Sequence, residues 1–394
     1  MTSPFTRDAA QPRFLLLIAI LFISYLCVAI PLAVVPVHVT QRLGFANAWA
    51  GLAVGAAFLS TIVSRGWAGR LTDRRGAKGA AMCGLSLYAG GAFLCLAAGF
   101  SILSPLAAFV VLLVGRLLVG VGESLVGVSV IGWGIGLVGP SRSGKVLAWV
   151  GASIYGALAI GGPVGLVLYQ QVGFAWTMAV SALLPCIGLL AIGMLTGIEP
   201  HPEAERPSYW SVIGTIWWYG LIVCLQGIGF AAIGAFFVLY FLHENWPLAG
   251  LGFTAFGGGF VLMRLCFGNF PDRFGGLPVA IVSLAIETVG QLLIWSANDP
   301  ALALAGAFLT GLGCSMIFPA MGREVVHLVP PHLRATALGG FSAFQDLAYG
   351  MTGPLAGLLA DRTGYGNVFL VGGVAAASGF GIALALRQRM LARQ

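Results

Sequence analysis

The sequence consists largely of apolar segments of about 20 residues or more, separated by short polar connections. A helix needs about 20 apolar residues to cross the hydrocarbon core of a bilayer. Hydrophobic residues make up 59% of the chain and charged residues only 8%, a composition that soluble domains do not have. The segments therefore predict an all-α integral membrane protein and exclude a water-soluble core.

Twelve transmembrane helices are predicted, and they cover residues 14–37, 47–68, 79–100, 105–131, 144–170, 173–196, 211–242, 247–270, 277–297, 300–326, 334–360 and 366–387. The longest polar connection, residues 197–210, is polar enough to be a linker. We therefore expect an N-terminal six-helix bundle at 1–196, a cytoplasmic linker at 197–210 and a C-terminal six-helix bundle at 211–394.

A charged motif occurs in both halves at an offset of 199 residues. Its members are Arg65, Gly69, Asp73, Arg74 and Gly76 in the first copy, and Arg264, Gly268, Asp272, Arg273 and Gly275 in the second. Two further matches have an offset of 191 residues, Gly120-Val121-Gly122 with Gly311-Leu312-Gly313 and Gly162-Pro163 with Gly353-Pro354. Matches in register at about half the chain length indicate two homologous halves.

The lysines and arginines of the connections predict the orientation, because cytoplasmic loops collect positive charge. With the N-terminus inside, fifteen cations fall on the cytoplasmic side and only Arg42 and Arg362 fall outside. Both termini and the linker are thus expected in the cytoplasm of a multi-pass inner-membrane protein. The net charge of +7 sets this topology and gives no reason to expect a nucleic-acid partner.

Catalytic and metal-binding motifs are not found in the sequence. The seven cysteines lie in apolar segments without a Cys-x-x-Cys pair, so neither a disulfide framework nor a zinc site is indicated. The segment from Gly139 to Lys145 resembles part of a phosphate-binding loop, but Val146 replaces the hydroxyl residue and no strand precedes it. We expect no enzymatic activity, no cofactor and no metal.

The connection between the second and third spans resembles the signature of the major facilitator superfamily. Gly69, Asp73, Arg74, Gly76 and Lys78 match that signature, and Ala77 departs from its usual basic residue. Arg116-x-x-x-Gly120-x-Gly122 is similar to the fourth-span motif of proton-coupled members, and Gly161-Gly162-Pro163-Val164-Gly165 resembles a degraded antiporter motif. The segments near Pro31 and Gly353 are most similar to the arabinose-efflux YhhS/YfcJ-type branch.

The resemblance implies two six-helix bundles around a central cavity lined by spans one, four, seven and ten. It also implies that the two charged motifs form a gating latch between the bundles, at Gly69, Asp73, Arg74, Gly76, Lys78, Gly268, Asp272, Arg273 and Gly275. The alternative for this loop is that its cations only hold it inside and contact anionic lipid.

Three ionisable residues within the spans are candidates for proton coupling or substrate binding. Arg116 and Glu123 are seven residues apart, about two helical turns, and so share one face of the fourth span. They predict either a proton-coupling site or a static ion pair. Asp346 lies deep in span eleven and needs a partner or a proton. Arg65 and Arg264 are expected to reach back toward the membrane surface.

These patterns predict a secondary transporter that works by alternating access. Proton-coupled efflux of a small organic solute is the expected activity, and a proton symporter or a uniporter for uptake is the alternative. The expected partners are the solute, protons and membrane lipid, and the protein is expected to be a monomer.

Overall fold

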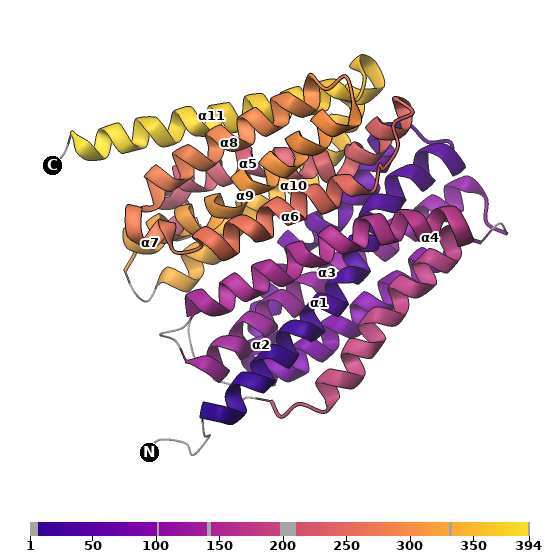
Figure 1. Cartoon of the computed structure of the whole chain (residues 1–394). Coiled ribbons are helices and arrows are strands. Elements are labelled where there is room, and N and C mark those ends of the chain that lie inside the picture. Colours follow the sequence, from indigo (N-terminus) through magenta and orange to yellow (C-terminus); the bar gives the residue numbers. More distant parts are fainter. Residues whose placement is uncertain (1–6, 101, 140–142, 198–209, 331–332, 393–394) are drawn as a thin grey trace.

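The computed structural model describes residues 7–100, 102–139, 143–197, 210–330 and 333–392, which contain helices and no strands. The elements in chain order are α1 (Arg7–Val37), η1 (His38–Arg42), α2 (Asn47–Ala97), α3 (Pro105–Val138), α4 (Ser143–Gly193), α5 (Trp210–His243), α6 (Leu251–Phe267), α7 (Phe270–Phe274), α8 (Gly276–Trp295), α9 (Pro300–Leu328), α10 (Arg334–Thr363) and α11 (Gly366–Leu391) (Figure 1).

These helices provide the twelve predicted spans. Eight described helices are long and apolar enough to cross a membrane. Two of them contain two spans each, because a single glycine with positive φ reverses the chain: Gly76 in α2 (φ 78°, ψ 158°) and Gly173 in α4 (φ 80°, ψ 177°). The shorter α6 and the more polar α10 complete the set of twelve. Helical structure thus continues through most of the connection expected between spans two and three.

The internal repeat is visible in the backbone. Gly76 and Gly275 are 199 residues apart and have nearly the same conformation, with φ of 78° and 88° and ψ of 158° and 157°. Gly173 and Gly364 are 191 residues apart and are also alike, with φ of 80° and 87°. Positive φ favours glycine because it has no Cβ. Both offsets found in the sequence therefore correspond to matching turns.

The first four long helices form one bundle and α5 to α11 form the other, with both chain ends at the same end of the molecule (Figure 1). The bundles contact each other along α2 with α10 and along α4 with α6. The α2–α10 contact is between backbones, since a Cβ on Gly51 would lie 2.0 Å from the Gly353 carbonyl oxygen. Most of the linker expected at 197–210 lies outside the described residues, so these bundle boundaries remain a prediction.

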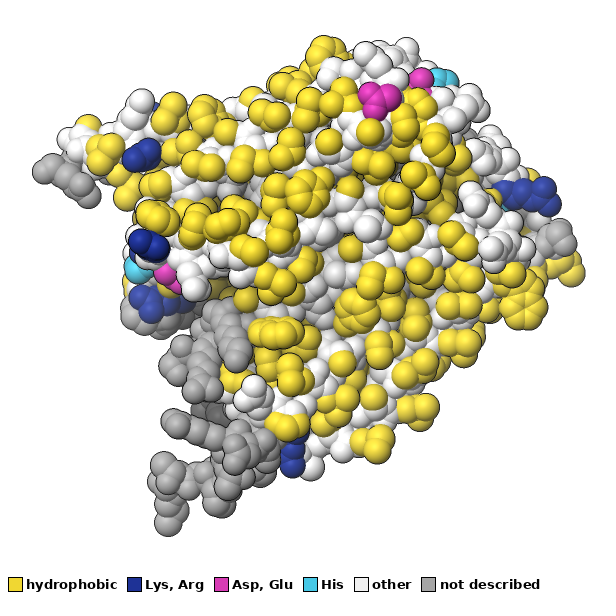
Figure 2. Space-filling view, in the orientation of Figure 1, with side chains coloured by type: hydrophobic (Ala, Val, Ile, Leu, Met, Phe, Trp, Pro, Cys, Tyr) yellow, Lys and Arg dark blue, Asp and Glu magenta, His cyan; other side chains and the backbone are white. Residues whose placement is uncertain are grey.

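The outer surface is suited to lipid. Figure 2 shows a face covered mainly by apolar side chains, with the charged ones near its edges. Several large apolar side chains are strongly exposed, including Val63 at 86% and Met194 at 87%. In water such a surface would promote aggregation, whereas in a bilayer it contacts hydrocarbon. The chain is a multi-pass membrane protein.

Candidate functional site

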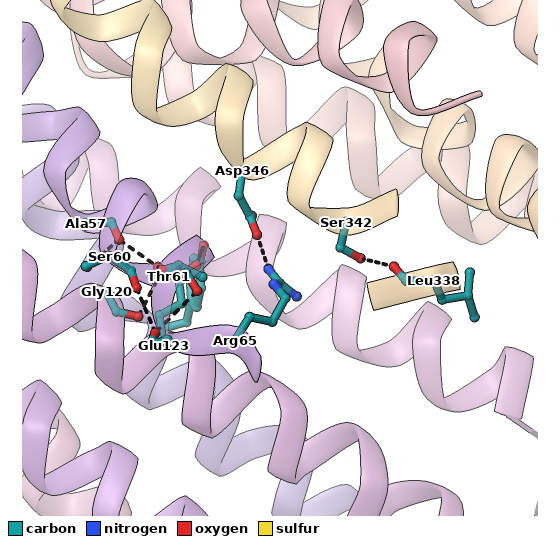
Figure 3. Close-up of polar contacts among 11 residues, drawn as sticks. Ala57, Ser60, Thr61, Arg65, Gly120, Glu123, Leu338, Ser342 and Asp346 are labelled. Carbon is teal, nitrogen blue, oxygen red and sulfur yellow. Dashed lines mark hydrogen bonds and ion pairs between the residues drawn. The ribbon is translucent and has the colours of Figure 1, made fainter. Parts of the chain in front are cut away.

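An ion pair joins the two bundles across the contact between α2 and α10. The Arg65 guanidinium on α2 donates to Oδ2 of Asp346 on α10 (Figure 3). The Asp346 side chain is 10% exposed and that of Arg65 is 28% exposed. Asp346 therefore has the partner that its depth requires. The expectation that Arg65 reaches back to the membrane surface was wrong, because its charge is directed at the opposite bundle.

Glu123 lies beside this ion pair on α3. One of its oxygens accepts a hydrogen bond from the Tyr25 hydroxyl at 3.1 Å. Its other oxygen, Oε2, is buried and has no hydrogen-bond partner among the described residues. Glu123 belongs to the N-terminal bundle, and Asp346 lies on α10 of the other bundle. Of these two acids, Asp346 is the one that contacts Arg65 in the described part of the chain.

Arg116 does not pair with Glu123, so the ion-pair alternative from the sequence was wrong. The Arg116 side chain is fully buried, and its Nε donates to the Ala53 carbonyl at 3.1 Å. Its two terminal nitrogens have no hydrogen-bond partner in the described part of the chain. A buried cation with free donors is costly in a membrane, and such residues are usually functional. The structure therefore contains a buried cation at Arg116 with two unpartnered donor groups, and its role in binding stays a prediction.

Small residues hold α3 directly against α2 at this level. A Cβ on Gly120 would lie 1.8 Å from the Ala57 carbonyl oxygen, so only glycine fits. Ser60 and Thr61 donate to the carbonyls of Leu117 and Gly120 at 2.8 and 2.9 Å (Figure 3). The sequence Arg116-x-x-x-Gly120 therefore combines a buried cation with a close helix contact that fixes its position.

The other contact between the bundles lacks the ion pair. By the two repeat offsets, Arg264 matches Arg65 and Tyr155 matches Asp346 (264 − 65 = 199 and 346 − 155 = 191). Arg264 donates to the Ser315 carbonyl at 2.8 Å and lies over the Phe260 ring at 5.3 Å. Tyr155 stacks on that same ring at 3.5 Å. Because tyrosine replaces the acid, the α2–α10 contact is the one between these helix pairs that has an ion pair among the described residues.

The first gating motif lies at the α2 turn beside the chain ends. Gly69 and Gly76 are buried, Asp73 is half-buried and Arg74 is exposed. Lys78 donates to two carbonyls at the end of α4, Gly193 at 2.9 Å and Leu195 at 2.6 Å. The described contacts of Lys78 thus stabilise its own bundle, as expected for a cation at a helix C-terminus.

The second motif also contacts its own bundle. Asp272 is 85% exposed and lies 3.8 Å from Arg323, which contacts Glu324 at 3.1 Å. Glu324 in turn accepts from the Gly276 amide at 2.7 Å. Arg273 is exposed, and Gly268 and Gly275 flank the short α7. A latch between the bundles formed by the two motifs stays a prediction.

The sequence interpretation missed a polar contact between the bundles at the end opposite to the chain ends. Asp361 on α10 accepts from the Asn47 amide side chain at 2.8 Å and from the backbone of Asn47 and Ala48 at 3.2 and 3.4 Å. Tyr365 donates to the Asn47 side chain at 2.9 Å. Asp361 therefore caps the start of α2 across the interface. A single acid in a polar connection carries no sequence signal of a distant partner.

A cavity of about 330 Å³ lies at that same end, between α1, α4, α5 and α6. Its walls are mainly apolar, and Gln41, Tyr169 and Gln170 are its polar residues. None of the charged candidates lines it. The charged group and this cavity are separate features of the interface.

Comparisons with known proteins agree with this geometry. The family model described as Major Facilitator Superfamily matches residues 17–249 and again residues 219–392. An uncharacterized MFS-type transporter of Salmonella typhimurium is 42% identical over 373 residues, which cover 94% of this chain and 95% of the relative. The two matches of one model also agree with the internal repeat.

Solved structures show the same fold at low sequence identity. A D-xylose-proton symporter has a TM-score of 0.78 at 14% identity, covering 94% of this chain and 97% of its own. The nucleoside transporter NupG has a TM-score of 0.76 at 16% identity, covering 94% and 99%. With its twelve spans, its two bundles and its repeated charged motif, the chain belongs to the major facilitator superfamily of secondary transporters.

Proposed function

We propose that the protein exports a small organic solute across the bacterial inner membrane in exchange for protons, with Arg65, Asp346 and Glu123 as the coupling group. The observation that supports this most directly is the Arg65–Asp346 ion pair, because it joins the two bundles and depends on the charge of one carboxylate. Protonation of Asp346 would remove that attraction. A proton can thereby act on the contact that alternating access must make and break.

Glu123 gives the coupling group a second carboxylate. Glu123 contacts Tyr25 here, and protonation of Asp346 would release the Arg65 cation to move toward Glu123 on its own bundle. The proton gradient can drive transport only if the two conformations bind protons differently. An ion pair between the bundles provides that difference. Arg116 lies on the same helix face as Glu123, and its two terminal nitrogens, which are buried and unpartnered among the described residues, would bind the solute when the bundles open.

Efflux is favoured over uptake by the antiporter-like glycines of α4. Cβ atoms on Gly161 and Gly165 would lie 2.6 and 2.8 Å from Ala29 and Ile30 of α1, so these glycines allow a close approach of the two helices. The segments near Pro31 and Gly353 favour the YhhS/YfcJ-type branch, and arabinose is therefore the first solute to test. The symporter and the uniporter are the alternatives that the experiment must separate.

The test uses purified protein in liposomes that contain a pH-sensitive dye, to which arabinose and a panel of sugars, organic acids and drugs are added one at a time. For an antiporter, inward movement of the solute should drive protons out and raise the internal pH. A fall in internal pH would indicate symport and contradict efflux by exchange. Solute uptake without a pH change would indicate a uniporter.

Both termini are expected in the cytoplasm, and this can be tested separately. A reporter enzyme that is active only in the periplasm, fused after residue 394, should show only background activity. A second fusion in the connection between α10 and α11, at Gly364, should be strongly active. The opposite pattern would reverse the orientation and with it the side from which protons enter.

A further inference from the structure

A second buried polar cluster lies inside the C-terminal bundle, away from the coupling group. Glu287 and Gln291 are one helical turn apart on α8, and both are fully buried. Gln226 on α5 is 1% exposed. A carboxylate with two amides in the interior of a membrane bundle is costly unless these groups have partners. Packing between the helices alone therefore does not account for this buried carboxylate and these two buried amides.

Four acceptor oxygens of this cluster are without donors. They are both carboxylate oxygens of Glu287 and the side-chain carbonyl oxygens of Gln226 and Gln291, and none has a hydrogen-bond partner within the described ranges. The Cys314 thiol lies against Glu287 and Gln226, but a thiol is only a weak donor. Buried polar atoms without partners are uncommon and often mark a site for an ion or water.

The packing of α5 and α11 brings these side chains together. A Cβ on Gly229 would lie 2.7 Å from Oε1 of Glu287 and 3.1 Å from Nε2 of Gln291. Nε2 of Gln291 donates to the Gly229 carbonyl at 3.2 Å and to the Thr310 hydroxyl at 3.3 Å. A Cβ on Gly372 would lie 2.4 Å from Oε1 of Gln291. The glycines leave the space that the polar groups occupy, and the hydrogen bonds hold the Gln291 amide in place.

We propose that Glu287, Gln291 and Gln226 bind a sodium ion. The described residues contain no cation paired with Glu287. A proton on Glu287 would supply one donor to four acceptors, whereas a hard cation is coordinated by several oxygens at once. A divalent ion would leave an uncompensated positive charge in a low-dielectric interior, since the cluster has one carboxylate. A monovalent cation with oxygen ligands satisfies both the charge and the acceptors.

The internal repeat explains how this site relates to the coupling group. Cys314 matches Glu123 (314 − 123 = 191), and Glu287 matches Tyr88 (287 − 88 = 199). The contact between the second span of α2 and α3 in one bundle is therefore equivalent to the contact between α8 and α9 in the other. Each of these contacts has one carboxylate, on α3 in the first and on α8 in the second. Cys314 belongs to the central core cluster that includes Tyr25.

Sodium binding is tested with the full-length purified protein in detergent, independently of any transported solute. Thermal unfolding is followed in sodium chloride and in potassium chloride or choline chloride of equal ionic strength. Sodium should raise the midpoint in a saturable way by about 2 °C or more, because a ligand that binds only the folded state stabilises it. Glu287→Gln should lose this response, and Glu123→Gln, the matched change in the other bundle, should retain it.

Binding of radioactive sodium to the unaltered protein provides a second measurement that does not depend on how well the variant folds. Saturable binding that is displaced by excess sodium chloride and not by potassium chloride is the expected result. Equal midpoints in all three salts, an unchanged sodium response in Glu287→Gln, or no saturable binding would each overturn the proposal. A midpoint that responds to pH and not to sodium would indicate a proton site instead and would also overturn it.

Discussion

Removal of either charge of the Arg65–Asp346 pair is expected to reduce transport at least about 100-fold while leaving the protein folded. Asp346→Asn leaves the Arg65 cation without a partner inside the membrane region. The loss of one partner of a buried ion pair typically costs about 3–5 kcal/mol. About 1.4 kcal/mol corresponds to a tenfold change in an equilibrium. The equilibrium between the two conformations would therefore shift far from balance, because only one of them contains the pair.

The double variant Arg65→Asp with Asp346→Arg distinguishes loss of the attraction between α2 and α10 from loss of proton coupling. It should restore solute exchange across the membrane toward the original level, since the attraction between α2 and α10 returns. Proton-driven accumulation should remain impaired, because the acid now lies on the other bundle. Solute exchange and accumulation are both measured in liposomes with an imposed pH gradient.

Arg264→Gln is the matched control, because Arg264 occupies the equivalent position and has no acidic partner among the described residues. It should affect transport much less than Arg65→Gln. If Arg65→Gln transports normally, or if the double variant is no better than either single change, the ion pair is not part of the conformational switch.

The architecture was predictable because it depends on patterns that are local in the sequence. Apolar segments and their polar connections predicted the twelve spans, and the glycines of the charged motif marked the α2 turn. The turns at Gly76 and Gly275 share a backbone conformation because each copy places glycine where φ is positive. The sequence did not predict that helix continues up to Gly76, since a polar connection is compatible with either a loop or a helix.

The site was only partly predictable, because it depends on contacts between distant residues. Asp346 was identified from its depth in an apolar segment, but its partner Arg65 is 281 residues away. Arg116 and Glu123 share a helix face as predicted, yet each contacts a different helix, Ala53 on α2 and Tyr25 on α1. Helical spacing predicts which side chains point the same way and does not predict which neighbour they meet.

The repeat was the one sequence signal that could have revealed more of the site. Applied to Asp346, the offset of 191 leads to Tyr155, and applied to Arg65, the offset of 199 leads to Arg264. The two contacts between the bundles are therefore expected to be related in position and different in charge. The structure has this asymmetry. By contrast, nothing in the sequence connects Asp361 with Asn47.

A bulky side chain at Gly51 is expected to slow transport strongly by preventing the bundles from closing at the end opposite to the chain ends. A Cβ on Gly51 would lie 2.0 Å from the Gly353 oxygen, and one on Gly353 would lie 2.3 Å from the Gly51 oxygen. Both obstacles are backbone atoms, which cannot move aside as a side chain would. The added bulk in Gly51→Val must therefore push α2 and α10 apart and weaken the Asp361–Asn47 contact.

Gly90→Val is the matched control, because Gly90 lies in the other span of α2, beyond the Gly76 turn, and a Cβ there meets nothing within 4 Å. The intrinsic helix preference changes equally in the two variants, so a difference between them reflects the contact. Overpacking of a close contact costs about 1–3 kcal/mol, and this cost falls only on the conformation in which α2 and α10 touch. Gly51→Val should therefore retain a normal yield and thermal midpoint but transport solute at least roughly tenfold more slowly, whereas Gly90→Val should behave as the unaltered protein. Equal transport by the two variants would mean that the α2–α10 contact does not take part in the transport cycle.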